Sequence, residues 1–274
     1  MNSSIQNQPF TGAYSIKVNL AGYKQGDRVY LPDTPVLQDK FITAISVFGV
    51  LNSVGDTIQD PDGDIISSVN FDNLYLTLTD KGTNEYLSKV PLTYFVYGNR
   101  QIDINRYVFL PNCYLTVGNS SAAQNCVLLT FFYRNPSKQV VYPETNGNIQ
   151  SLEVPVFTSD YNRFYLPDNR ILADKKIRNI YSTGQETFGE DNALTTNGTP
   201  IVKSSNAFLT AIHQNEIVLY RLPVYYLAQW YTIFELIMDN IQIDLPSSYI
   251  ELSKNISSTV GNKCVYLNFE YDED

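Results

Sequence analysis

The acidic segment Asp60-Pro-Asp-Gly-Asp64 has the clearest spacing for chemistry in this chain. Its three carboxylates, on Asp60, Asp62 and Asp64, alternate along the chain and supply the oxygen ligands that hard cations such as calcium prefer. The segment lacks the later bidentate glutamate and the full loop spacing of an EF-hand. We therefore favour a solvated acidic turn, with a calcium site as the alternative.

His213 is the only histidine, within Thr210-Ala-Ile-His-Gln-Asn-Glu216. A catalytic triad or a histidine-based metal site needs partners that a single histidine cannot supply. Because His213 follows a predicted strand, we interpret it as an ordinary surface or loop residue.

Acidic residues also recur at matching places in the chain. Asp33 and Asp168 each follow Tyr-Leu-Pro, and Asp39-Lys40 recurs as Asp174-Lys175. Paired acids can carry out acid–base chemistry. Here each member stands alone at a turn, so capping of the turn is the favoured role for Asp33 and Asp168. We expect both Asp-Lys pairs to be structural as well.

The three cysteines, Cys113, Cys126 and Cys264, are too few for a disulfide framework, and we expect them to be reduced. Cys126 and Cys264 are interpreted as small, inert side chains. No glycine-rich phosphate loop follows a strand and opens a helix. The sequence therefore predicts no enzyme, and we assign no catalytic, cofactor-binding or metal-binding residue and expect no cofactor.

Charge and hydropathy restrict the partners. The net charge is −9, whereas nucleic-acid backbones are bound by clustered lysine and arginine, so no direct nucleic-acid binding is expected. The N-terminus has no basic region followed by an apolar run, which predicts no signal peptide. No apolar stretch reaches the ~18 residues of a transmembrane helix.

An internal repeat organises the whole chain. Arg28-Val-Tyr-Leu-Pro-Asp33 recurs as Arg163-Phe-Tyr-Leu-Pro-Asp168, an offset of 163 minus 28, or 135 residues. Further matches follow in the same order: Leu37–Ile45 with Leu172–Ile180, Asn73–Thr77 with Asn206–Thr210, Val90–Tyr94 with Leu222–Tyr226, Leu110–Leu115 with Leu245–Ile250, and Cys126–Tyr133 with Cys264–Tyr271.

This period is far longer than the ~20–50 residues of solenoid repeats, so each copy is expected to be a domain. The sequence predicts a first domain over residues 1–140, a linker over 141–152 and a second domain over 153–274.

Short apolar runs separated by turn residues predict an all-β fold. In the first copy the strand candidates are 28–31, 40–50, 74–79, 85–90, 92–97, 107–109, 114–117 and 127–133. This density of strands favours two tandem β-sandwich or jelly-roll domains. One segment differs: 227–238 is rich in helix formers and predicts a short helical insertion in the second copy, with a buried strand as the alternative.

Comparing the copies also predicts which face of the last strand is buried. Alternate residues are shared: Val127, Leu129, Phe131 and Tyr133 in one copy, Val265, Leu267, Phe269 and Tyr271 in the other. The intervening residues change, so the shared set is expected to face the core. The spacing of Ile42 and Ile45, and of Ile177 and Ile180, does not fit a regular strand and predicts either a bulge or a strand buried on both faces.

Two jelly rolls in one chain with a helical insertion resemble the double jelly-roll major capsid proteins of tailless icosahedral bacteriophages. The resemblance lies in the architecture and not in a motif. It implies a structural virion protein, made in the host cytoplasm, whose homotrimer forms a pseudo-hexameric capsomer with other virion proteins as partners. A head-decoration, ring or fibre protein of a tailed phage is one alternative, and a tandem carbohydrate-binding module is another.

Overall fold

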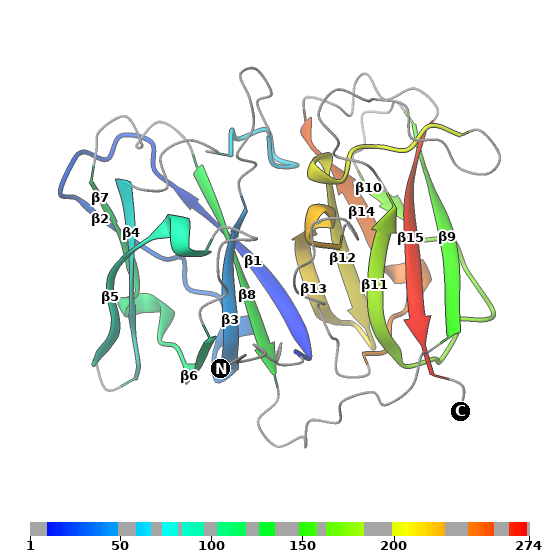
Figure 1. The fold of residues 1–274 in the computed structure, drawn as a ribbon, viewed down its shortest axis with the longest axis horizontal. Helices are drawn as coiled ribbons and strands as arrows, with labels where there is room; N and C mark the ends of the chain where they lie inside the picture. The colour runs from blue at the N-terminus through cyan, green and yellow to red at the C-terminus, as the bar shows by residue number, and fades with distance from the viewer. Residues whose placement is uncertain are drawn as a thin grey trace, which may run out of the picture.

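The computed structural model describes residues 10–48, 59–66, 73–81, 84–95, 103–118, 126–134, 148–157, 163–183, 199–227, 241–254 and 263–272. The fold is all-β, as predicted, with strands joined by loops and short 3₁₀ helices (Figure 1). The 3₁₀ helices are η1 (Pro35–Leu37), η3 (Leu92–Phe95), η4 (Leu110–Asn112), η6 (Ser204–Asn206), η7 (Val224–Leu227) and η8 (Leu245–Ser247).

The first unit consists of two facing layers of four strands (Figure 1). One layer has the order β1 (Gly12–Asn19), β8 (Cys126–Arg134), β3 (Phe41–Phe48) and β6 (Asp103–Tyr107). The other has the order β2 (Arg28–Tyr30), β7 (Tyr114–Val117), β4 (Leu74–Thr79) and β5 (Glu85–Pro91).

The second unit has a matching strand order, with three strands in one of its two layers. One layer has the order β10 (Arg163–Tyr165), β14 (Tyr249–Leu252), β12 (Ala207–His213) and β13 (Glu216–Pro223). The other has the order β9 (Asn148–Val156), β15 (Lys263–Tyr271) and β11 (Ile177–Thr183). Ile241 forms an isolated bridge to Ile177, at the place that β6 takes beside β3 in the first unit.

Local geometry is repeated as well. The Arg28 guanidinium lies 4.5 Å from the centre of the Tyr114 ring, and that of Arg163 lies 4.7 Å from the Tyr249 ring. Isolated parallel bridges join Ile66 to Cys126 and Ile201 to Cys264.

The strands β5 and β13 share an unusual backbone feature. Lys89 and Arg221, which the repeat aligns, both have positive φ, at 50° and 46°. In both strands the backbone N–H at this position donates to a threonine hydroxyl on the neighbouring strand, Thr77 or Thr210, at 3.2 Å. Because a long side chain rarely adopts this conformation, its occurrence at both positions supports the residue-level alignment of β5 with β13.

The shared alternate residues of the last strands face the core, as predicted. Val127, Leu129 and Phe131 are fully buried inside the first unit, and Leu267 and Phe269 inside the second. The expected irregularity after Ile42 and Ile177 is a β-bulge in both units, since the strand register shifts between Ile42 and Ala44 and between Ile177 and Asn179.

Other sequence predictions need correction. The segment 92–97, predicted as a strand, begins as the 3₁₀ helix η3, and β6 lies at Asp103–Tyr107 instead of 107–109. The strands β1 and β9 were not among the strand candidates, and residues 148–152, assigned to the linker, form the first half of β9. The remaining linker residues 141–147, and 228–238 of the predicted helical insertion, lie outside the described residues.

Candidate functional site

The two units meet where β1 of the first lies beside β13 of the second. These strands pair in parallel, Ala13 opposite Leu219 and Tyr14 opposite Tyr220, and join layers from both units into one eight-stranded sheet. The rings of Tyr14 and Tyr220 stack with their centres 4.5 Å apart. This junction concentrates most of the unusual side-chain chemistry of the described chain, so we treat it as the candidate site.

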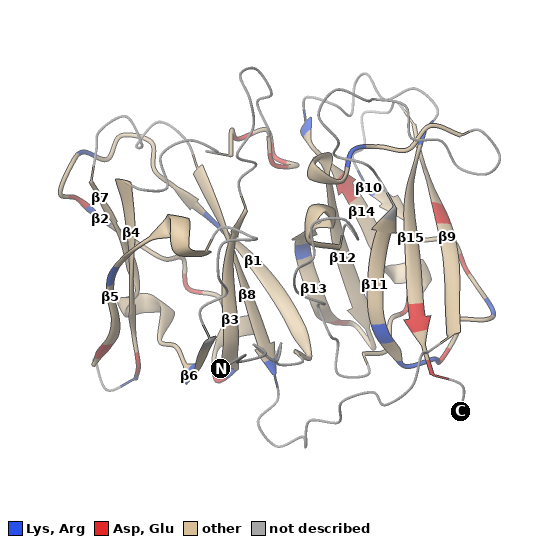
Figure 2. Ribbon diagram, in the orientation of Figure 1, with Lys and Arg blue, Asp and Glu red and all other residues tan. Residues whose placement is uncertain are grey.

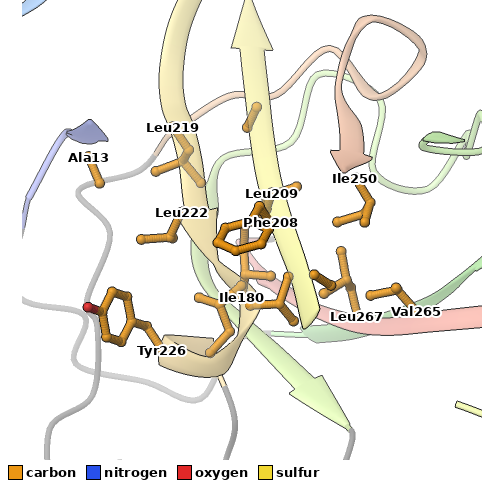
Figure 3. Close-up of a cluster of buried hydrophobic side chains, with 14 of the residues drawn as sticks. Ala13, Ile180, Phe208, Leu209, Leu219, Leu222, Tyr226, Ile250, Val265 and Leu267 are labelled. Carbon is orange, nitrogen blue, oxygen red and sulfur yellow. The ribbon is translucent and has the colours of Figure 1, made fainter. Parts of the chain in front are cut away.

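The apolar part of the junction covers the outer face of the first unit. Phe48 lies 5.9 Å, between ring centres, from both Phe208 and Tyr226, and Phe132 lies 6.4 Å from Tyr226. Figure 3 shows Ala13 of the first unit and Tyr226 of η7 beside Leu219 and Phe208. Consequently β8 is buried on both faces, although only one face was predicted to lie inside.

The acidic segment forms a turn held by its own first residue. Asp60 is 2% exposed, and its Oδ1 accepts hydrogen bonds from the backbone N–H groups of Asp62 and Asp64, at 3.0 and 2.8 Å. All three carboxylates converge on the ammonium of Lys17 on β1, at 2.7, 3.0 and 2.6 Å. The charge of the acidic turn predicted from sequence is therefore partly compensated, and a calcium ion would have to displace Lys17 from the carboxylates.

Arg221 extends this cluster into the second unit. Its guanidinium donates two hydrogen bonds to the Asp62 carboxylate, at 2.7 and 3.0 Å, and its Nε lies 3.1 Å from Glu251. Glu251 is 2% exposed and also accepts a hydrogen bond from Arg163 at 3.2 Å. The acidic segment lies between the two units in Figure 2, so these charges connect the units directly.

Electrostatics keeps the cluster ionised. The Arg221 guanidinium holds the pKa of Asp62 well below its usual range. Burial alone would lower the pKa of Lys17, but its hydrogen bonds to the three aspartates raise it above the ordinary value, and Asp62 and Glu251 do the same for Arg221. Groups with such fixed charges are poor general acids or bases near neutral pH. The arrangement is suited to fastening two units together.

A cavity of about 410 Å³ opens beside the cluster. Its lining comes from both units and includes Tyr14, Lys17, Asp60, Tyr220 and Arg221. Lys17, Asp60 and Arg221 in its wall are engaged in ion pairs, Asp33 in its wall accepts a hydrogen bond from Gln38, and the two tyrosines stack on each other.

His213 is the last residue of β12, and its described partner is Asp244, not a member of the ion cluster. Its Nδ1 is 3.5 Å from Oδ1 of Asp244, and the other oxygen of Asp244 accepts the backbone N–H of Gln214 at 2.7 Å. The side chain is partly exposed at a hairpin between β12 and β13, in agreement with the interpretation of His213 as an ordinary residue near a loop.

The capping role predicted for Asp33 and Asp168 is not what the structure shows. Both side chains are exposed, and Asp33 accepts a hydrogen bond only from the side chain of Gln38, at 3.3 Å, among its described contacts. In the second unit the turn is capped by Asn169, whose Oδ1 accepts the backbone N–H of Ile171 at 2.9 Å. The residue that caps this turn is therefore Asn169, one position after Asp168.

The Asp-Lys pairs do have a structural role. Asp39 and Asp174 have nearly equal positive φ, at 61° and 62°, a conformation that aspartate tolerates better than most residues. Asp39 also forms an ion pair with Lys81, and the Lys40 ammonium lies 5.5 Å from the centre of the Tyr133 ring.

The three cysteines are free and buried, as expected from the sequence. Burial raises the pKa of Cys126 to about 12 and that of Cys264 to about 11, and it also raises that of Cys113. Thiols with such values carry little thiolate at neutral pH and are unreactive.

Sequence reasoning did not find Lys17, Arg221 or Glu251. A usable signal was present in the comparison of the two copies, because Arg221 aligns with Lys89 and the apolar Phe132 with Glu270. In the last strands, the shared residues Phe131 and Phe269 lie in the cores, whereas Phe132, which differs from Glu270, lies at the junction.

Comparison with known protein families, curated proteins and solved structures found no match for this chain. Within the described ranges, no helix is long and apolar enough to cross a membrane. The same ranges contain no cluster of histidine, cysteine, aspartate or glutamate arranged to hold a metal ion.

Proposed function

We propose that this chain is a structural virion protein, a double jelly-roll major capsid protein whose homotrimers form pseudo-hexameric capsomers. The proposal includes a tandem duplication of one jelly-roll domain. It is supported by the matching strand orders of the two units and by the repeated bulges and positive-φ positions. A jelly roll consists of eight strands in two layers, and capsid proteins are among the proteins that use it.

The observation that carries the proposal is the way in which the units contact each other. The first unit uses the layer β1-β8-β3-β6, and the second uses the layer β10-β14-β12-β13, which is the counterpart of the opposite layer in the first. This contact is heterologous, because it joins two different surfaces of similar units. A contact of this kind can be repeated from one unit to the next. Contacts of this kind generate a ring when the rotation closes.

Two units in each chain make the trimer a natural closed form. Three chains would place six similar units around one axis, and a pseudo-hexagonal building block tiles a shell. The apolar and ionic junction within the chain supports this role, because it fixes the angle between units that a ring requires.

Size measurement tests the proposal. Light scattering and analytical ultracentrifugation at micromolar concentration should give the mass of a trimer, and electron microscopy of concentrated samples should show pseudo-hexameric particles or shells. An open fibre or a ring of other symmetry would favour the decoration, ring or fibre alternative. A monomer at every concentration that is stabilised by sugars would support the carbohydrate-binding alternative and refute the capsomer.

A further inference from the structure

Two of the sheet edges that have no partner strand within the described residues belong to β5 and β9. The strand β5 ends the order β2-β7-β4-β5, and β9 ends the order β11-β15-β9. Their counterparts in the other unit are β13 and β1, which pair with each other at the junction. Each unit therefore has one edge paired within the chain, while the equivalent edge of the other unit stays open. An open edge presents backbone groups that can pair with another strand.

The repeat fixes which residues correspond. Gly12 is paired with Tyr133 and Asn148 with Tyr271, so Ala13 corresponds to Ile149 and Tyr14 to Gln150. On the other strand, the shared positive-φ position aligns Lys89 with Arg221. It follows that Leu87 corresponds to Leu219 and Ser88 to Tyr220.

Exposure at these positions indicates a missing partner. Ala13 and Tyr226 are 0% exposed because the junction covers them. Their counterparts, Ile149 on β9 and Tyr94 in η3 directly after β5, are 64% and 53% exposed. A large aliphatic side chain and a tyrosine thus stand uncovered where the equivalent positions are buried, and aromatic residues are enriched at protein interfaces.

Charge is complementary on the two open edges. At the junction, the cations Lys17 and Arg221 are bridged by Asp62. The positions that correspond to them are Glu153 on β9 and Lys89 on β5, which have opposite signs. When these edges meet as β1 and β13 do, Glu153 and Lys89 would neutralise each other without a bridging residue.

We infer that the partner of these edges is a second copy of this chain: β5 of one copy pairs in parallel with β9 of the next. The junction register places Leu87 opposite Ile149 and Ser88 opposite Gln150. This inference rests on the proposed assembly and names the surface that forms it. Because the contact is again between unlike faces, it continues the ring that the junction within the chain begins.

The contact between copies is more polar than the junction within the chain. Phe132 and Leu128, buried at the junction, correspond to Glu270 and Tyr266 on the outer face of β15. Two units that are never separated can share an apolar contact. Separate copies expose this surface to water before they assemble, so it has to be polar. The polar, tyrosine-rich outer face of β15 meets that requirement.

Charge reversal tests the pairing. Lys89→Glu and Glu153→Lys should each raise the dissociation constant between copies at least about tenfold, because each places like charges opposite each other. The double variant restores opposite charges and should recover most of the wild-type affinity. Lys24→Glu, at an exposed lysine in the loop before β2, the strand at the opposite end of the sheet from β5, is the control and should leave the affinity unchanged. Circular dichroism of each variant checks that the fold is retained.

Crosslinking tests the register. Leu87→Cys combined with Ile149→Cys should yield disulfide-linked oligomers on oxidation, because opposite residues on paired strands lie within disulfide range. The native cysteines are buried and should not interfere. Leu87→Cys combined with Ile171→Cys, which is also exposed but not on an edge, is the control and should remain uncrosslinked.

The outcomes separate the two proposals. A wild-type trimer whose affinity is insensitive to both charge reversals, and whose Leu87→Cys/Ile149→Cys variant does not crosslink, would overturn the β5–β9 contact and leave the capsid proposal standing. A wild-type chain that stays monomeric and enters no particle would overturn both. Recovery in the double variant together with crosslinking at Leu87 and Ile149 would establish the contact.

Discussion

Removing the Phe132 ring should weaken the junction between the units. The side chain is 3% exposed, lies on the outer face of β8, and packs edge-on against Phe10 at 5.1 Å between ring centres and against Tyr226 on the second unit. Phe132→Ala deletes a buried aromatic and leaves a cavity, which typically costs ~3–5 kcal/mol. The loss should be near this range because Phe48 on β3 and Tyr226 in η7 are held by their own elements and cannot collapse into the space.

The repeat supplies a matched control for this experiment. Glu270 has the equivalent position in the second unit, on a face that no described residue of the first unit covers. Its carboxylate accepts a hydrogen bond from the Tyr181 hydroxyl at 2.9 Å. Glu270→Ala should cost under ~1 kcal/mol, since a partly exposed polar contact contributes little net stability.

Urea unfolding followed by circular dichroism measures both changes. Phe132 belongs to an apolar cluster that continues into the core of the second unit, while the inner core of the first unit is a separate cluster, so its loss should also broaden the transition or divide it into two steps. Equal free-energy losses from Phe132→Ala and Glu270→Ala would refute the reasoning, because they would show that the two equivalent faces are equally buried.

Three further predictions follow from the same contacts. Phe131→Ala and Phe269→Ala, which truncate fully buried rings in the two cores, should each cost ~3–5 kcal/mol of unfolding free energy in urea titrations. Arg221 lowers the pKa of Asp62, so this carboxylate stabilises the fold above its ordinary pKa of about 4, and the contribution is lost as the pH falls toward the depressed value. Asp62→Asn should therefore be less stable at pH 7 and show a flatter loss below about pH 4; an unchanged acid profile would contradict the ion pair. The buried thiols should resist iodoacetamide at pH 8 and react only after denaturant is added, as intact-protein mass spectrometry would show.

Much of the fold could be predicted because the sequence contains an internal repeat whose two copies can be compared. Shared residues such as Phe131 and Phe269 identified the core face, and the spacing of Ile42 and Ile45 predicted a bulge that lies between Ile42 and Ala44. The comparison was uninformative where the copies share no motif, and for this reason β1 and β9 were missed. The 3₁₀ helix η3 was mistaken for a strand because its apolar residues have no period that separates a single helical turn from a short strand.

The junction could not be predicted because its chemistry depends on segments far apart in the sequence. Asp62 and Arg221 are separated by 159 residues, and neither has a partner of opposite charge at a short spacing that would reveal the pair. The acidic segment was interpreted as a solvated turn, with a calcium site as the alternative, and the cation that its carboxylates contact is the Lys17 ammonium from β1. A local motif can thus indicate the charge of a partner without indicating which residue supplies it.

The proposed assembly explains why some residues differ between the two copies of the repeat. At the junction within the chain, Phe132, Ala13 and Arg221 are buried or paired, and the contact never needs to open. Their counterparts, Glu270, Ile149 and Lys89, would lie at the contact between chains, which must form anew for each copy. Identical faces at both places would let free chains aggregate through an exposed phenylalanine face before a ring could close. Replacing that face by charged and hydroxyl groups slows unwanted association, while the opposite charges of Glu153 and Lys89 still select the correct edge. The same fold can therefore serve as a permanent joint in one place and a reversible one in the other.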